Sequence, residues 1–172
     1  MQRPGWLAVF LVCAAGTAHA DGDPDDPRQT PFDRGRVGFS ISVGEMSALG
    51  YNYFSVGAGA GYFVLDGLEI GGFALHEFGS GPSINEVSPA LRYVAQPLVG
   101  SWPVIPYTAV FYNHWFLGSG FSDVDTVGAR AGLLHLSSSH LIVGLGVAYE
   151  RTISTCTSCN SVYPDVTFGF SF

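Results

Sequence analysis

The last eleven residues of the chain, 162–172, alternate between apolar and small or polar side chains. Successive side chains of a β-strand point to opposite faces, so one face of this segment suits hydrocarbon and the other suits a polar interior. One parity carries Val162, Val166, Phe168, Phe170 and Phe172. The other parity carries Asp165, Thr167, Gly169 and Ser171. This contrast over this length predicts one strand of a transmembrane β-barrel.

The same alternation occurs in seven earlier runs, separated by turn-forming residues. The eight predicted strands cover 37–43, 54–64, 68–76, 87–96, 104–115, 126–136, 141–150 and 162–172. We therefore predict an all-β fold, an eight-stranded antiparallel up-and-down transmembrane β-barrel over residues 37–172, although the pattern leaves ten strands open. The contrast between faces is weakest in 104–115, where we take Tyr107, Ala109 and Phe111 as outward.

The predicted connections differ in length along the chain. Those at 44–53, 77–86, 116–125 and 151–161 are longer than those at 65–67 and 137–140. An even number of strands places both chain ends on the periplasmic side, and bacterial barrels have short periplasmic turns and long outer loops. The lengths therefore fit a barrel whose long connections are extracellular.

A soluble periplasmic β-sandwich is the alternative all-β fold. Its strands would carry polar residues on the outer face and large apolar residues on the inner one. Here Gly, Ser and Ala occupy the face opposite the large apolar residues. Because a soluble core lined mainly by glycine would be nearly empty, this pattern favours the barrel.

The first twenty residues read as a cleaved secretory signal, with Arg3 before a short apolar run and an Ala-His-Ala site ending at Ala20. Residues 21–36 are acidic and rich in proline, so we expect a disordered periplasmic lead-in. The chain has a net charge of −7, which argues against a nucleic-acid partner. These features predict a monomer in the bacterial outer membrane, with membrane lipids as its surroundings.

Three segments resemble the OmpA-like small outer-membrane β-barrel superfamily. The run from Ala60 to Ile70, with its Gly-Tyr-Phe-Val sequence and short turn, is similar to the second hairpin of that family. Residues 104–107, Val-Ile-Pro-Tyr, resemble the start of its fifth strand, and residues 166–172 resemble its last strand. In outer-membrane barrels the terminal aromatic belongs to the signal read by the barrel-insertion machinery, which implies this role for Phe168, Phe170 and Phe172. The family has diverse tasks, so the resemblance implies no catalytic residue.

Five charged residues have the parity of the lumen: Glu69, Arg92, Arg130, Glu150 and Asp165. An arginine on the lipid face near the bilayer midplane would cost about 2–4 kcal/mol. Inside a narrow lumen, opposite charges should pair to offset desolvation. We therefore expect Arg92 and Arg130 to share Asp165 and Glu150. The structural interpretation of this cluster is a polar plug that fills the narrow lumen, and the functional alternative is a gated ion path.

Cys156 and Cys159 lie in the last predicted outer connection. Because the expected compartment is oxidising, we predict a disulfide between them. A zinc site would need about four ligands, and the mature chain offers too few there. We predict no metal and no cofactor.

His135, Ser137 and Glu150 superficially resemble the catalytic set of lipid A deacylase barrels. A catalytic set requires mutual hydrogen-bonding reach. The predicted hairpin puts Glu150 at the end opposite His135 and Ser137, which argues against an enzyme. The sequence thus favours a structural or surface-interaction role through the outer loops. A narrow channel for water or small ions is the first alternative, and a lipid-modifying enzyme is the second.

Overall fold

The computed structural model describes residues 11–12, 30–48, 51–99, 102–118, 120, 122–137, 141–154 and 159–171. The strands are β1 (Leu11–Val12), β2 (Val37–Ala48), β3 (Tyr51–Leu65), β4 (Leu68–Gly79), β5 (Ile84–Val94), β6 (Val104–Leu117), β7 (Val124–Leu136), β8 (Leu141–Thr152) and β9 (Asn160–Ser171). One short helix, α1 (Gln96–Val99), lies between β5 and β6. Within these ranges, no helix has the length and apolar character needed to cross a membrane.

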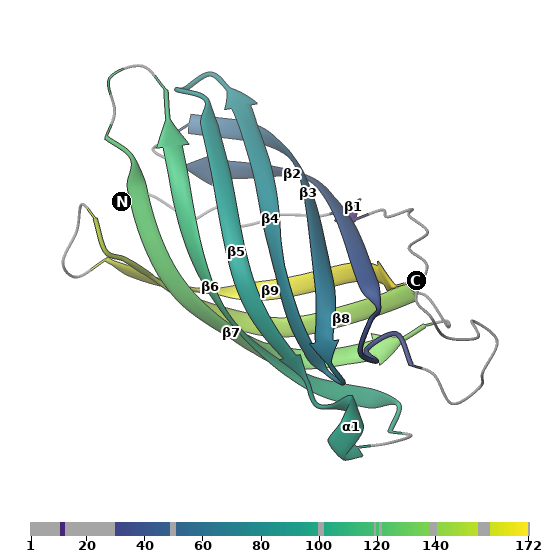
Figure 1. Cartoon of the computed structure of the whole chain (residues 1–172). Coiled ribbons are helices and arrows are strands. Elements are labelled where there is room, and N and C mark those ends of the chain that lie inside the picture. The colour runs from purple at the N-terminus through teal and green to yellow at the C-terminus, as the bar shows by residue number, and fades with distance from the viewer. Residues whose placement is uncertain are drawn as a thin grey trace.

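Strands β2 to β9 form a closed antiparallel β-barrel of eight strands, as predicted. Each strand pairs with the next along the chain, and β2 pairs with β9 to close the ring. Figure 1 shows the strands following one another around the barrel, with α1 at one end. We call the end that carries α1 the lower end and the opposite one the upper end.

The seam between β2 and β9 is the shortest contact between neighbouring barrel strands. Its register joins Gly38 to Ser171 and Phe39 to Phe170. Above these pairs, β1 lies against β2, with Leu11 opposite Val43. Two residues of the predicted signal segment therefore extend the sheet at this seam, and cleavage after Ala20 stays a prediction.

Side chains alternate across the barrel wall on most strands as predicted. On β8, Val147 is 55% exposed on the outer face, whereas its neighbour Ala148 is 1% exposed in the lumen. On β3, Val56 and Tyr62 are exposed, whereas Phe63 is buried. These exposures confirm the predicted inward and outward faces of the two strands. The prediction succeeds here because the two faces of each strand differ strongly in side-chain size or polarity.

The predicted orientation of β6 is wrong. Tyr107, Ala109 and Phe111 are buried and face the lumen, whereas Val110 is exposed on the outer face. Both parities of this strand carry large apolar residues, so hydrophobic alternation does not distinguish them. Tyr107 also donates a hydrogen bond from its hydroxyl to the lumen carboxylate Asp165.

The strands are longer at the upper end than predicted, and the connections are shorter. The segment 77–86 was expected to be a loop, but β4 continues to Gly79 and β5 starts at Ile84. At the lower end, the predicted Asp66-Gly67 turn is present, with Gly67 at a φ of 77°. A positive φ favours glycine because it has no Cβ. The residues at 138–140 lie outside the described part of the chain.

Candidate functional site in the barrel lumen

The lower lumen is closed by buried apolar side chains, which we call the lower plug. Its members are Phe32, Phe63, Val94, Ile105, Tyr107, Leu134 and Ile142. They come from the segment before β2 and from β3, β5, β6, β7 and β8. The Phe32 and Phe63 rings meet edge to face, with centroids 5.9 Å apart. Six separate segments therefore fill one cross-section of the barrel.

Phe32 is held in the plug by an ordered turn at residues 30–36. The backbone N–H and the hydroxyl of Thr30 both donate to the Asp33 carboxylate, each at 2.7 Å. The Gly67 N–H donates to the Phe32 carbonyl at 2.8 Å, which ties this turn to the β3–β4 hairpin. The prediction of disorder is therefore wrong for residues 30–36, and residues 21–29 lie outside the described ranges. A single aromatic residue anchors this part of the acidic segment.

Above the plug, Arg92 forms an ion pair with Glu69. The two residues are directly opposite each other on β5 and β4, so their side chains start from neighbouring positions on the lumen face. A Cβ at Gly61 would overlap the Glu69 carboxylate, so this glycine leaves the space that the ion pair occupies. Arg92 thus pairs with Glu69 rather than with the predicted Asp165 or Glu150.

Arg130 is placed between an aromatic ring and a carboxylate. Its guanidinium carbon lies 4.5 Å from the centroid of the Phe111 ring, within the range of a cation–π contact. Its Nη1 lies 3.6 Å from Asp165 Oδ1, so the predicted pairing of these two residues is present. Asp165 also accepts a hydrogen bond from the Tyr107 hydroxyl, which connects this pair to the lower plug.

Glu150 is surrounded by neutral donors. Asn113 Nδ2 donates to Glu150 Oε1 at 3.1 Å, and the Tyr163 hydroxyl donates to Oε2 at 3.0 Å. The Thr126 hydroxyl also donates to Oε1. Ser88 in turn donates to Asn113 Oδ1 at 2.6 Å. A carboxylate can be stabilised by several such hydrogen bonds without an adjacent cation, which is why Glu150 does not need the arginine partner that we predicted.

Sequence reasoning missed two further lumen carboxylates, Glu77 and Glu86. Glu77 is 2% exposed, and its Oε2 is buried without a hydrogen-bond partner. Glu86 interacts electrostatically with Glu150, Glu77 and Arg130. Both lie on the inward parity of their strands, so extending the alternation past Glu69 and Arg92 would have found them. The sequence-based prediction omits them because it assigns residues 77–86 to a loop.

The catalytic set suggested by the resemblance to deacylase barrels is not assembled. His135 is opposite Val143 near the lower end of the β7–β8 pair, whereas Glu150 is opposite Gly128 near the upper end. His135 Nδ1 lies 2.9 Å from the Pro103 carbonyl oxygen, an exposed contact at the lower rim. Because His135 and Glu150 lie at opposite ends of these strands, they cannot form hydrogen bonds within one catalytic triad.

The remaining predicted sites lie on β9 and just before it. Cys159 is disulfide-bonded, whereas Cys156 lies outside the described residues, so their pairing stays a prediction. Phe168 and Phe170 are half-buried on β9, and Phe172 lies outside the described residues. Across the described ranges, no group of three or more His, Cys, Asp or Glu side chains could hold a metal ion.

Comparisons with known proteins give no relative for this chain. It matches no protein-family model, no curated protein and no solved structure. The similarity to OmpA-like barrels therefore remains an interpretation of the sequence segments named above.

Proposed function

We propose that this protein is a bacterial outer-membrane β-barrel with a structural or surface-interaction role, exercised through its outer loops and without catalysis. The observation that carries the proposal is a belt of exposed apolar side chains around the barrel. The belt includes Val56, Tyr62, Ile70, Leu91, Val110, Leu133, Leu145, Val147 and Val162. Soluble monomers rarely expose contiguous apolar patches larger than roughly a few hundred Å². A lipid bilayer is the environment in which such a belt is favourable.

The charges of the lumen support the same environment. Glu69, Arg92, Arg130, Glu150 and Asp165 are directed inward and engage in ion pairs or hydrogen bonds. The barrel wall therefore carries large apolar side chains on its outer face and these charged side chains on its inner face. A soluble protein has the opposite arrangement, with charged side chains outside. Lipids of the outer membrane and the barrel-insertion machinery are the partners that this proposal implies.

The filling of the lumen favours a structural role over a channel. The lower plug joins residues from six segments, including Phe32 from outside the barrel strands. Above it, the ion pair of Arg92 and Glu69 and that of Arg130 and Asp165 fill further space. Continuous water or ion flow would require these packed groups to move, so we expect the purified protein to lack steady conductance.

The upper end is the side that we assign to the cell exterior. Strands β3 and β6 have 15 and 14 residues, more than the about 9–11 residues that a tilted strand needs to cross a bilayer. We place the length that exceeds the bilayer at the upper end, where β4 connects to β5, β6 to β7 and β8 to β9. Contacts with other molecules would occur through these projecting ends.

Topology and location can be tested together with short epitope tags in living cells. One tag follows Gly81 at the upper end, and a matched control tag follows Leu98 in α1 at the lower end. We expect antibody to label the first tag on intact cells and the second only after the outer membrane is permeabilised. Recovery of both proteins in the soluble periplasmic fraction would contradict the proposal, as would labelling of the Leu98 tag alone on intact cells.

Conductance measurements on the same purified protein distinguish the structural role from the channel alternative. In planar bilayers we expect no steady openings from the wild-type chain. Openings that disappear when a bulky residue replaces Gly144 or Gly146 in the lumen would instead establish a water-filled path.

A further inference from the structure

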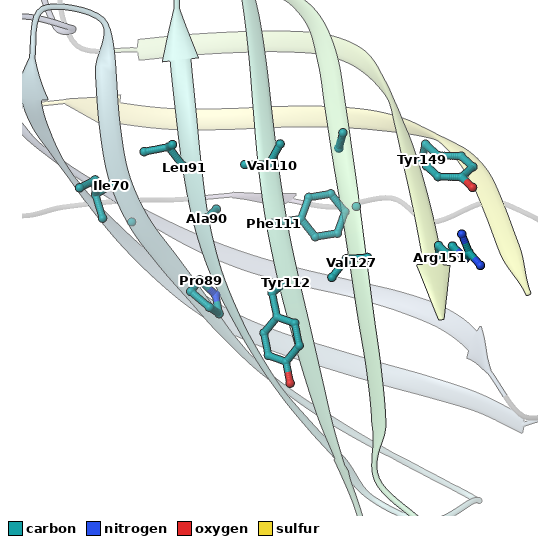
Figure 2. Close-up of a pocket in the computed structure, with 13 residues that line it drawn as sticks. Ile70, Pro89, Ala90, Leu91, Val110, Phe111, Tyr112, Val127, Tyr149 and Arg151 are labelled. Atoms are coloured by element: carbon teal, nitrogen blue, oxygen red, sulfur yellow. The ribbon is translucent and has the colours of Figure 1, made fainter. Parts of the chain in front are cut away.

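The outer face of the barrel carries a shallow apolar groove of about 760 Å³ across β4 to β8. Figure 2 shows two rows of side chains that border it. The strand register places the first row in line across five strands, as Ile70, Leu91, Val110, Ala129 and Tyr149. The second row continues from Pro89 through Tyr112, Val127 and Arg151. We call this feature the outer groove.

Small residues keep the floor of the outer groove low. Ala129 is the small outward residue among the larger side chains, and the backbone of Gly71, Ala90 and Gly128, whose side-chain positions face the lumen, completes the floor. The lining is otherwise almost entirely hydrocarbon, so no polar head group would be satisfied along most of its length. A flexible alkyl chain is the ligand that best complements a long, shallow and apolar surface of this kind.

The groove runs obliquely from the lower to the upper part of the barrel wall. Ile70 is close to Leu68, the first residue of β4 at the lower end. Tyr149 and Arg151 are close to Thr152, the last residue of β8 at the upper end. Strands of transmembrane barrels are tilted by roughly 35–45°, so a row that crosses them also climbs through the bilayer. An alkyl chain lying in the groove would therefore follow the direction of neighbouring lipid chains.

The upper end of the groove has a different chemistry from the rest. Arg151 lines it there, whereas Arg92 and Arg130 face the lumen and Arg34 lies at the lower end. Just above, the Asp125 carboxylate is held by His114 Nδ1 at 2.6 Å and by the Tyr112 hydroxyl. Tyrosine side chains such as Tyr112 are typical of the headgroup region of a membrane. Arginine in this position complements a phosphate.

We propose that the outer groove binds an acyl chain of a phosphorylated glycolipid of the lipid A class, with Arg151 contacting its phosphate. This inference rests on the proposed outer-membrane location. The outer leaflet is the source that fits, because the cationic end of the groove is the upper end that we assign to the cell exterior. Lipids of the opposite leaflet would present their phosphates at the lower rim, away from Arg151.

Native mass spectrometry of the detergent-purified protein tests the proposal. The protein is titrated with lipid A and, separately, with phosphatidylglycerol and phosphatidylethanolamine. We expect selective binding of lipid A. We also expect Arg151→Gln to weaken this binding by about tenfold, which corresponds to about 1.4 kcal/mol, because glutamine cannot form a charge-assisted hydrogen bond with the phosphate. Ala129→Trp should abolish binding by filling the floor of the groove.

Two matched variants control for general effects. Ala131→Trp adds the same bulk to the same outer face of β7 outside the groove, and Arg34→Gln removes an arginine at the lower end. Both should bind lipid A like the wild type. Equal binding by Ala129→Trp and the wild type would overturn the proposal, as would equal binding of lipid A and phosphatidylglycerol. Heat-modifiable gel migration of each variant identifies a folded barrel.

The two levels of the proposal fail in different ways. If the chain fractionates with the outer membrane and its Gly81 tag is labelled on intact cells, but lipid A does not bind selectively, only the groove assignment is overturned. If the chain fractionates as a soluble periplasmic protein, both the outer-membrane location and the groove assignment are overturned.

Discussion

The lower and upper parts of the lumen are filled by different chemistry. The lower plug is a small apolar core in which Leu134 and Val94 are 0% exposed. The upper part is a hydrogen-bonded network around Glu150, flanked by Glu77 and Glu86. Apolar packing derives its stability from excluded water and close contact, whereas a polar network must satisfy each buried group. Side chains that point into the lumen of this barrel can therefore be apolar or polar, depending on their height in the barrel.

The largest expected effect comes from making a cavity in the lower plug. Leu134→Ala should lower the free energy of unfolding by about 2–5 kcal/mol, because the rigid barrel wall prevents collapse around the missing atoms. Leu133→Ala on the outer face is the matched control, since Leu133 is 53% exposed on the same strand. Urea titration of the detergent-solubilised protein, followed by gel migration, measures both. Equal losses would contradict the assignment of a lower core.

Breaking the ion pair above the plug should have a smaller effect. Glu69→Gln leaves the Arg92 guanidinium without its anionic partner, but the Arg92 side chain is 24% exposed and remains partly hydrated. We expect a loss of about 1–3 kcal/mol in the unfolding free energy, which is less than the loss for a fully buried ion pair. The double variant Glu69→Gln with Arg92→Met should recover part of this loss, because no uncompensated charge remains. A double variant less stable than the additive sum would refute the pairing.

The smallest effect is expected in the upper network. Thr126→Val removes one donor to Glu150 Oε1 while Asn113 continues to donate to the same oxygen. A loss of about 1 kcal/mol should result, measured by the same titration. Adding Tyr163→Phe removes the donor to the other carboxylate oxygen and should cost more than the first change. Insensitivity to both changes would mean that solvent rather than these side chains stabilises Glu150.

Sequence patterns predicted the barrel and most of its wall because alternation is a local property. Leu145 and Val147 could be assigned to the outer face since glycine and alanine occupy the opposite parity. The pattern failed on β6, where both faces carry large apolar residues. It also failed for Phe32, because its burial depends on partners from several distant strands. Charge partners are equally non-local: Arg92 meets Glu69 only because the β4–β5 register places them opposite each other.

The central claim is that the outward side chains contact lipid, and spin labels in reconstituted vesicles test it most directly. In a background with Cys156 and Cys159 replaced by serine, one cysteine replaces Leu145 on the outer face and another replaces Ser122 in the β6–β7 connection. The label at Leu145 should relax strongly with oxygen, which concentrates in the bilayer, and weakly with a water-soluble nickel chelate. The label at Ser122 should show the reverse. If the chelate reaches Leu145 as readily as Ser122, the barrel does not present this face to a membrane.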